Sequence, residues 1–457
     1  MSQVQLPTQG LTPISYQTHT FGCKVNTYDT GLIQKNLNQQ GMKQDQSKKP
    51  ESLVHVLNTC AVTAEASKEA VRLIRKIKSG SPFAKIVVTG CAAQVDTDLF
   101  ESLPSVDLIV ANSHKSQLPF LIQDLYNGKL TSKVFKQNIF KKEDLEEGGG
   151  IEESHSRIFL KIQDGCNSFC SYCVIPFARG KSRSLSIQSL VQRVNDLYSQ
   201  NFREVVLTGI HIGDYEDIVR GQSLKLEDLI ESLLKLTKMP RFRISSLEPV
   251  EVSERLLDLY QDPRLVPHFH MSIQSANTQV LQQMRRNYSQ KEVMSALNQI
   301  AKKVSDVYVG MDVIVGFPSE SHEDFEDTYL TLSNLPWTKI HVFPYSHRPG
   351  TRATKIGQDT HANDKSRRAE RLRELSLHRM NEAANAQIGK TLQCLMLHKK
   401  DKQGRTAFLS RNNWNIFVPT DVHRLHIHHQ HEELRVKIST SEINARGEVQ
   451  LFGVLND

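Results

Sequence analysis

The chain has 457 residues, enough for two to four domains of ordinary size. Hydrophobic residues make up 39% and charged residues 23% of it, which is typical of a globular protein and excludes collagen-like and wholly disordered classes. No apolar run approaches the roughly 18 residues of a membrane span, and Met1–Thr12 lacks the apolar stretch of a signal peptide. We therefore expect a cytoplasmic protein without membrane association. The net charge of +7 permits a nucleic acid partner but does not establish one.

Strand and helix patterns alternate in the first segment, residues 1–126. The expected strands are Ile14–Phe21, Leu53–Leu57, Lys85–Thr89 and Val106–Val110, with helices that end at Gly41 and Gly80. This alternation predicts an open α/β domain with parallel strands. Cys23, Cys60 and Cys91 each follow the carboxyl end of one strand, the edge at which such sheets bind ligands. The alternative is that they are three unrelated buried cysteines.

Residues 127–153 are expected to form a linker, because they contain the charge cluster Lys141–Glu147 and three consecutive glycines. Residues 154–387 show six strand patterns separated by helical ones, which predicts a partial (β/α)6 barrel. The strands are Ile158–Ile162, Glu204–Thr208, Phe242–Ser246, His268–Ile273, Val307–Val315 and Lys339–Phe343. Polar or small residues that follow these strands should gather on one face of the barrel: Gly209, Glu248, Gln274 and Gly316.

Residues 388–457 are expected to form a small all-β barrel. Five short strand patterns predict it: Leu392–Leu397, Thr406–Leu409, Asn415–Pro419, Glu433–Ile438 and Val449–Val454. Such barrels often bind single-stranded nucleic acids, and a domain that only packs is an equal alternative. Cys394 is expected in the core of this barrel, and Trp337 and Trp414 are as well suited to packing as to base stacking. A histidine cluster at residues 423–431 is expected to be a polar turn rather than a metal site.

Seven cysteines are too few, and odd in number, for a disulfide scaffold. Cys166, Cys170 and Cys173 have the spacing C-x3-C-x2-C directly after the first barrel strand. Thiolates suit zinc and iron–sulfur clusters equally, but structural zinc takes four ligands, and the next histidine is His211. Three cysteines on a four-iron cluster would leave one iron open to a small molecule.

The string from Gln163 to Gly180 resembles the radical S-adenosylmethionine (SAM) superfamily and, within it, the methylthiotransferases. The resemblance implies that Cys166, Cys170 and Cys173 hold a 4Fe–4S cluster whose open iron binds SAM. One electron from the cluster then cleaves SAM to a 5′-deoxyadenosyl radical. The electron donor would be a reduced flavodoxin or ferredoxin.

The methylthiotransferase resemblance also accounts for Cys23, Cys60 and Cys91, which in that family hold a second 4Fe–4S cluster that carries the sulfur to be inserted. The third segment resembles the family's RNA-binding TRAM barrel. Gly22-Cys23-Lys24-Val25-Asn26 resembles the MtaB type, which methylthiolates threonylcarbamoyladenosine in the anticodon loop of tRNA. Ser319-Glu320 and Ser275-Ala276-Asn277 depart from the usual pattern, and the third segment matches the TRAM pattern weakly around Arg411-Asn412-Asn413-Trp414. None of these departures affects a cluster cysteine.

The resemblance implies that the radical chemistry is carried by the clusters and SAM, with no catalytic side chain identified. The residues expected around SAM are Tyr172, Gly209, Ser246, Glu248, Gln274, Val313 and Gly316. The cations expected to contact the tRNA are Arg285, Arg286, Arg348 and Arg352, although for each a solvated surface charge is the simpler interpretation. No DNA partner is expected. Three alternatives stay open: isopentenyladenosine tRNA as substrate, a ribosomal-protein aspartate as substrate, and a non-catalytic zinc-stabilised RNA-binding protein.

Overall fold

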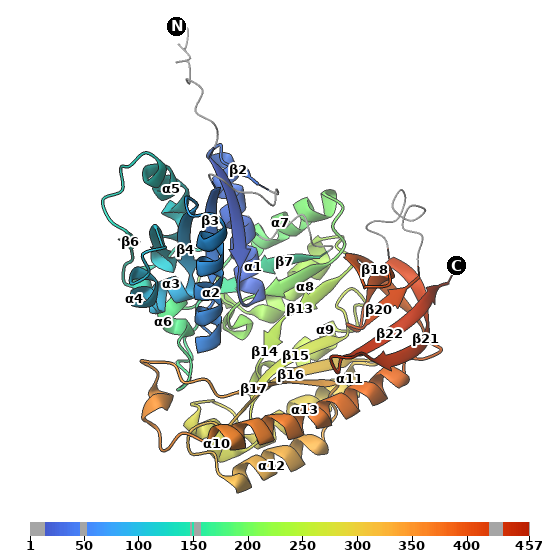
Figure 1. Cartoon of the computed structure of the whole chain (residues 1–457). Coiled ribbons are helices and arrows are strands. Elements are labelled where there is room, and N and C mark those ends of the chain that lie inside the picture. The colour runs from blue at the N-terminus through green and yellow to red at the C-terminus, as the bar shows by residue number, and fades with distance from the viewer. Residues whose placement is uncertain (1–13, 46–52, 147–148, 150–156, 420–432, 457) are drawn as a thin grey trace. The chain divides into compact units, whose positions relative to one another are not determined.

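The structure, a computed structural model, describes residues 14–45, 53–146, 149, 157–419 and 433–456. The histidine cluster at residues 423–431 and most of the glycine-rich part of the expected linker lie outside these ranges. The chain forms two compact units (Figure 1). Unit 1 comprises Met1–Lys142, Glu146–Gly150 and Phe177–Arg179, and unit 2 comprises Glu143–Leu145, Ile151–Pro176 and Gly180–Asp457. Within the described ranges, no helix has the length and apolar character needed to cross a membrane.

Unit 1 is an open α/β sheet in which all six strands run parallel, as predicted. Its order is β2-β1-β3-β4-β5-β6, and the strands are β1 Ser15–Thr20, β2 Lys43–Gln44, β3 Leu53–Thr59, β4 Lys85–Gly90, β5 Leu108–Ala111 and β6 Val134–Phe135. The helices are α1 Lys24–Gln39, α2 Ala64–Gly80, α3 Cys91–Val95, α4 Thr97–Glu101 and α5 Leu118–Tyr126. Strand β6 falls inside the segment expected to be a linker, because two residues are too few to give a strand pattern.

Helix α2 of unit 1 forms where one face of the sequence is apolar and a polar side chain caps the first turn. Thr63 accepts a hydrogen bond from the backbone N–H of Ala66 at 3.2 Å, and Ala70 and Ile74, one turn apart, are fully buried. The exposed side of the same helix carries Arg72 and Arg75. The apolar residues that give α2 its helical pattern, Ala70 and Ile74, are therefore also the residues that it buries.

Unit 2 begins with a partial (β/α)6 barrel, as predicted. Strands β7 Ile158–Lys161, β10 Val205–Thr208 and β13 Phe242–Ile244 form one parallel sheet. Strands β14 Ser246–Leu247, β15 His268–Gln274, β16 Tyr308–Val315 and β17 Lys339–Pro344 form the second. The segment expected as one strand, Phe242–Ser246, is interrupted at Ser245, so that its first part pairs with β10 and its second part with β15.

The helices of this barrel are α6 Ile175–Arg179, α7 Ile187–Ser199, α8 Leu226–Leu236, α9 Glu254–Leu259, α10 Thr278–Gln283, α11 Gln290–Lys303, α12 His322–Ser333 and α13 Ala362–Asn385. Four short strands lie in its loops: β8 Gln163–Asp164, β9 Arg183–Ser184, β11 Asp217–Val219 and β12 Gln222–Leu224. The last turn of α6, Phe177–Arg179, belongs to unit 1 by its contacts.

The C-terminal part of unit 2 is a closed five-stranded barrel, as predicted. Its order is β18-β19-β20-β22-β21, and the strands are β18 Thr391–Lys400, β19 Thr406–Ser410, β20 Asn415–Val418, β21 Glu433–Ile443 and β22 Val449–Leu455. Cys394 is fully buried in its core, as expected. Trp414 is buried edge-on against Tyr308, and the buried indole N–H of Trp337 donates to the carbonyl of Leu332. Both tryptophans therefore serve packing.

A buried ionic network joins this small barrel to the partial barrel. Glu204 is fully buried between Arg241, at 2.7 Å, and Arg243, at 3.1 Å. Arg241 also donates to the carbonyls of Leu409 and Ser410 in β19. Because these groups are withdrawn from water, each depends on its partners, and the network fixes the small barrel to the strands that precede it.

Candidate functional site

Cys23, Cys60 and Cys91 follow β1, β3 and β4, which are neighbours in the sheet of unit 1. Cys60 and Cys91 are buried, whereas Cys23 is exposed. Burial, followed by the nearby thiol of Cys91, raises the pKa of Cys60 to about 12, and burial likewise raises the pKa of Cys91. The two buried thiols, which are costly to ionise, suit a cation that binds thiolates and offsets their charge.

Two glycines allow the three loops to approach one another. Gly22 has a φ of 90°, and a Cβ atom on it would lie 2.6 Å from the Sγ of Cys60. Gly90 has a φ of 92°, and a Cβ there would lie 2.5 Å from the carbonyl oxygen of Thr59. Both positions combine a left-handed backbone with a close approach, so both require glycine.

Buried polar contacts hold these loops in unit 1. The side-chain amide of Asn26 donates to the carbonyls of Phe21, at 2.7 Å, and Thr59, at 3.1 Å. Arg179 donates to the side-chain oxygen of Asn26 at 2.6 Å and to Asp29 at 3.1 Å. Lys115 pairs with the same Asp29 carboxylate at 3.0 Å.

The positive charges of Arg179 and Lys115 act on the thiols as well as on Asp29. Both lower the pKa of Cys91 and so oppose the effect of its burial. Asn112 places its side-chain nitrogen 3.8 Å from the Sγ of Cys91 and donates to the carbonyl of Ala178 at 2.9 Å. The loops thus form a prearranged site with compensating positive charge.

Cys166, Cys170 and Cys173 lie in one loop after β8 in unit 2. Burial is the largest cause of a raised pKa at Cys170 and Cys173, and for Cys173, whose pKa is raised to about 12, the thiol of Cys170 adds to it. The loop is anchored at Ser171, whose hydroxyl donates to the carbonyl of Gln283 at 2.7 Å. Like the first set, these thiols suit a metal that binds them as thiolates.

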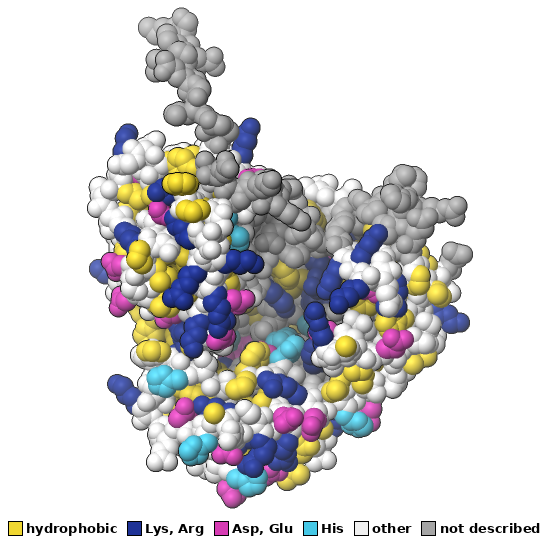
Figure 2. All heavy atoms as spheres, in the orientation of Figure 1, with side chains coloured by type: hydrophobic (Ala, Val, Ile, Leu, Met, Phe, Trp, Pro, Cys, Tyr) yellow, Lys and Arg dark blue, Asp and Glu magenta, His cyan; other side chains and the backbone are white. Residues whose placement is uncertain are grey.

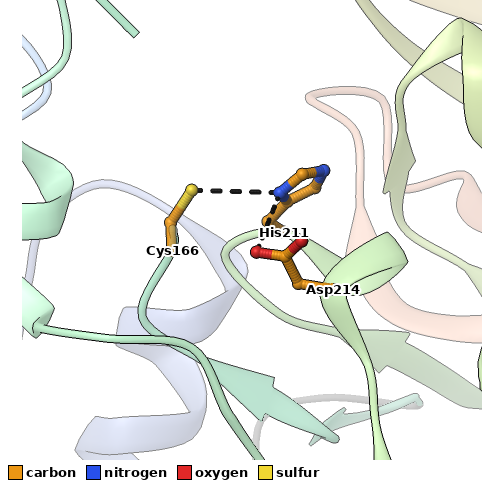
Figure 3. Close-up of side chains that lie close together, drawn as sticks. All are labelled: Cys166, His211 and Asp214. Atoms are coloured by element: carbon orange, nitrogen blue, oxygen red, sulfur yellow. Dashed lines mark hydrogen bonds and ion pairs between the residues drawn. The ribbon is translucent and has the colours of Figure 1, made fainter. Parts of the chain in front are cut away.

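His211 reaches this loop from the segment after β10 (Figure 3). Its Nδ1 lies 3.9 Å from the Sγ of Cys166 and 3.2 Å from the carboxylate of Asp214. Its Nε2 lies 2.5 Å from Glu251. Burial alone would lower the pKa of His211, but the hydrogen bonds to Asp214, Cys166 and Glu251 raise it well above its usual value.

In the sequence, His211 lies far from the cysteines, and neither Asp214 nor Glu251 is expected near them. The structure differs from this expectation, because β7 and β10 are neighbours and their carboxyl ends meet. The position of His211 after a barrel strand was the available signal.

Gly209, expected near SAM, lies against Gln163 of the cysteine motif. The side-chain oxygen of Gln163 accepts hydrogen bonds from the backbone N–H groups of Ile210 and His211, both at 3.0 Å. A Cβ atom on Gly209 would lie 2.8 Å from that oxygen. Gln163 therefore sets the path of the loop, and Gly209 is more than a strand-ending turn.

Glu248 and Tyr172, also expected near SAM, are brought together by Arg286. Arg286 forms a buried ion pair with Glu248 and donates to the Tyr172 hydroxyl at 2.6 Å. Only 8% of the Arg286 side chain is exposed. The structure thus differs from the expectation that Arg286 contacts RNA, because its guanidinium is already bound between two groups of the site.

The other residues expected around SAM lie on β14 to β16 or, for Gly316, directly after β16. Ser246 is half-buried and pairs with His270 of β15, while Gln274 is buried at a φ of 61° and pairs with Val313. Val313 is fully buried. The backbone N–H of Gly316 donates to Glu320 at 2.6 Å. These residues thus lie at or near the ends of neighbouring strands. However, the Val313 side chain is buried in the core, and the Gly316 N–H already has a hydrogen-bond acceptor.

Arg285 and Arg352 are exposed, as an RNA contact requires. Arg348 is only 4% exposed, which differs from its expected role as a surface contact with phosphate. Figure 2 shows Lys and Arg side chains mixed with Asp and Glu over the visible face of each unit. Charge alone therefore does not single out an RNA-binding surface on that face.

Comparison with known proteins agrees with this arrangement. Residues 15–111 match "Uncharacterized protein family UPF0004", and residues 160–332 match the "Radical SAM superfamily". The radical SAM methyltransferase TsrM from Kitasatospora setae has a similar fold, with a TM-score of 0.56 at 13% identity over 75% of this chain and 77% of that one. The fold and the C-x3-C-x2-C loop define the class: this is a radical SAM enzyme, a transferase that uses a 4Fe–4S cluster and SAM.

The chain belongs to the MtaB family of methylthiotransferases. It is 36% identical to the threonylcarbamoyladenosine tRNA methylthiotransferase MtaB of Aquifex aeolicus, over 83% of this chain and 92% of that protein. The MtaB protein of Bacillus subtilis is 33% identical over 88% and 87%. A tRNA-2-methylthio-N(6)-dimethylallyladenosine synthase of Staphylococcus haemolyticus is 28% identical over 86% and 77%.

Proposed function

We propose that this protein replaces the C2 hydrogen of threonylcarbamoyladenosine, beside the tRNA anticodon, with a methylthio group. The observation that carries the proposal is the presence of two separate three-cysteine sets, one at the carboxyl ends of three parallel strands and the other in a single loop after β8. A single radical step needs one cluster, whereas sulfur insertion needs a second place to hold sulfur. The MtaB relatives, which cover most of the chain, support this substrate over the alternatives.

In this proposal Cys166, Cys170 and Cys173 hold the SAM-binding cluster. The bound cluster and SAM supply a carbon radical that can remove the C2 hydrogen, which is not acidic enough for a side-chain base. Gln163 holds the Gly209–His211 loop in place, and this loop would bind the methionine part of SAM. The remaining SAM contacts are assigned to Tyr172, Ser246, Glu248 and Gln274, whereas the Val313 side chain and the Gly316 N–H are already used in the fold.

Cys23, Cys60 and Cys91 are proposed to hold a second 4Fe–4S cluster. The donor set is chemically suitable, since all three ligands are thiols and two of them are buried with raised pKa values. Arg179 and Lys115 supply buried positive charge beside this set and would offset the negative charge of a thiolate-bound cluster.

Gly22→Ala is expected to abolish iron binding at this second set, because the new Cβ atom would overlap the Sγ of Cys60. Gly41→Ala is the matched control, since Gly41 has a similar φ of 79° but nothing within 4 Å of its Cβ position. Both variants carry the same backbone strain of about 1–2 kcal/mol. Iron and sulfide analysis should show a loss of about half the iron in Gly22→Ala only. Equal iron in both variants would contradict the assignment.

The proposed partners are the tRNA anticodon loop and a reduced flavodoxin or ferredoxin, in the cytoplasm. An unpaired loop suits this reaction because its bases can be turned out of the stack. Arg285 and Arg352 are the exposed cations proposed to contact the RNA. The proposed domains are residues 1–126 for methylthiotransfer, 154–387 for the radical SAM barrel and 388–457 for RNA binding, with β6 of the linker segment added to the first sheet.

The test is mass spectrometry of tRNA nucleosides from cells with and without this gene. Loss of the methylthio-threonylcarbamoyl nucleoside, with accumulation of its precursor, is expected. Restoring the gene with Cys60→Ala should leave the precursor accumulated, whereas the wild-type gene should restore the product. Loss of the methylthio-isopentenyl nucleoside instead would overturn the substrate assignment. Zinc in place of iron and acid-labile sulfide in the purified protein would favour the non-catalytic alternative.

A further inference from the structure

Helix α10 ends in a tight turn that lies against the loop of residues 166–173, the cysteine loop of unit 2. The backbone N–H of Arg286 donates to the carbonyl of Leu281 at 2.9 Å. The backbone N–H of Arg285 donates to the carbonyl of Gln282 at the same distance. This pair of bonds defines a Schellman turn, whose left-handed position is usually glycine. Arg285 takes that position with a φ of 60°, and the turn sets the direction in which Arg286 leaves the helix.

The cysteine loop supplies hydrogen-bond donors to this helix end. The last carbonyls of a helix have no partner inside the helix and need one outside it. The Ser171 hydroxyl donates to the carbonyl of Gln283 at 2.7 Å, and the Ser171 backbone N–H donates to that of Met284 at 3.0 Å. Because Ser171 stands between Cys170 and Cys173, the end of α10 holds the middle of the cysteine motif.

Arg286 adds a further contact to the loop and joins it to a second strand end. One of its terminal nitrogens donates to the Tyr172 hydroxyl at 2.6 Å, and the other forms the ion pair with Glu248. Tyr172 belongs to the cysteine loop, whereas Glu248 follows β14. A guanidinium is planar and its N–H directions are fixed, so the bridge sets how far apart these two groups lie.

The surroundings of the guanidinium hold it in this position. Its central carbon lies 5.8 Å from the ring centroids of both Tyr172 and Tyr288. Burial raises the pKa of Glu248, and the charge of Arg286 opposes that rise. The Nε–H of Arg286 is buried and meets no acceptor among the described residues. Since buried donors without an acceptor are rare, the side chain is placed for its two terminal contacts rather than for the largest number of hydrogen bonds.

We propose that Arg286 is a positioning residue of the SAM site, which holds Tyr172 and Glu248 in the arrangement that receives SAM. This inference rests on the part of the proposed function that assigns SAM contacts to these two residues. The Tyr172 hydroxyl accepts from Arg286, so its own hydrogen remains for donation, whereas the Glu248 carboxylate only accepts. SAM offers both kinds of partner: a carboxylate that accepts, and an ammonium group and ribose hydroxyls that donate.

The bridge has a function separate from holding the cluster. Without Arg286, Glu248 would lie buried without its counter-charge, and the Tyr172 hydroxyl would lose the donor that orients it. The two hydrogen bonds of Ser171 to the end of α10 would remain, and so would the three cysteines. Loss of the bridge should therefore weaken SAM binding while the loop keeps its iron.

The test measures the dissociation constant of SAM by equilibrium dialysis. It uses the enzyme with both clusters reconstituted and oxidised, so that SAM is bound but not cleaved. In Arg286→Met the dissociation constant should rise at least about tenfold, because two charge-assisted hydrogen bonds are lost. The iron content should stay at the wild-type level. With the clusters reduced, KM for SAM should rise by a larger factor than kcat of SAM cleavage falls.

Two conservative variants separate the bridge from the charge alone. In Arg286→Lys the ammonium group can pair with Glu248 but lacks the planar fork that also reaches Tyr172, so SAM binding should recover only in part. Tyr172→Phe keeps the ring and removes the hydroxyl, and it should weaken SAM binding by itself. Combined with Arg286→Met, it should add little to the effect of Arg286→Met, because both changes act through one contact.

Arg255→Met is the matched control. Arg255 on α9 also bridges two groups, Asp228 at 2.7 Å and Glu231 at 2.8 Å, but its side chain is 51% exposed. This variant should bind SAM as the wild type does. If Arg286→Met does not fold, Arg286→Lys and Tyr172→Phe decide the question, since each keeps most of the buried volume.

The outcomes separate this inference from the proposed function. If the wild type binds no SAM, the assigned SAM contacts fail, and the inference fails with them. If the wild type binds SAM and Arg286→Lys binds it equally well, charge alone suffices and the bridge is overturned. Loss of iron in Arg286→Met would also overturn it, because Arg286 would then hold the loop together rather than align two side chains. No tRNA enters these measurements, so an error in the tRNA substrate leaves their result unchanged.

Discussion

Cys166→Ala is expected to abolish SAM cleavage completely and to lower the iron content of the protein by about half. Each proposed cluster has three protein ligands, so the loss of one would leave too few to hold it. Cys60→Ala should also remove about half the iron, but it should leave SAM cleavage intact and abolish only the methylthio product. Iron and sulfide analysis, combined with measurement of 5′-deoxyadenosine under reducing, anaerobic conditions, distinguishes the two variants.

Cys394→Ala is the control for both variants. Cys394 is a buried cysteine of the C-terminal barrel core, remote in sequence from either set, and its replacement should leave iron content and SAM cleavage unchanged. If Cys166→Ala retained SAM cleavage, the assignment of the radical chemistry to this loop would be wrong. If Cys60→Ala retained all its iron and formed the methylthio product, the second cluster would have to be abandoned.

Glu204→Gln is expected to destabilise unit 2 by about 3–5 kcal/mol, because it leaves Arg241 and Arg243 buried without their shared counter-charge. The effect should reach the C-terminal barrel, since Arg241 also binds Leu409 and Ser410. Urea unfolding gives the change in the free energy of unfolding. Glu231→Gln removes an exposed carboxylate on α8 and should leave the unfolding midpoint unchanged. Equal stability of Glu204→Gln and the wild type would refute this account.

The same carboxylate predicts how stability depends on pH. Burial raises the pKa of Glu204, but the charges of Arg241 and Arg243 lower it by more than burial raises it. The pKa of Glu204 is therefore well below its usual value. A depressed pKa contributes stability that is present above the unfolded-state value, about 4.3, and is lost as the pH falls toward the folded-state value. The wild type should therefore lose stability below about pH 4 more steeply than Glu204→Gln.

A strand or helix could be predicted from the sequence where the residues of that segment alone show its pattern. Apolar runs marked β3 and β4, and the alternation of strands with helices indicated that the strands are parallel. The two-residue strand β6 and the break at Ser245 could not be predicted. The first pairs only because β5 is already in place, and the second depends on which neighbour each half of the strand meets.

The cysteines of the site could be predicted from the sequence, but the side chains that surround them could not. A cysteine after a strand is a local pattern, and strand order then decides which cysteines meet. The contact of His211 with Cys166 and the binding of Arg179 by Asp29 join residues 45 and 150 positions apart. Arg286 was expected on the surface together with its neighbour Arg285. Two consecutive arginines do not show in the sequence that Arg285 is exposed and Arg286 is not. Such contacts follow from tertiary packing.

The two cysteine sets differ in how far apart their members lie along the chain, and this difference sets the order in which each can mature. Cys166, Cys170 and Cys173 share one short loop, so this set can capture a metal ion while the surrounding chain is still unfolded. It is therefore the set exposed to mis-metallation by zinc during synthesis. Cys23, Cys60 and Cys91 come together only after β1, β3 and β4 have paired, so insertion of the proposed second cluster would have to follow folding of the sheet.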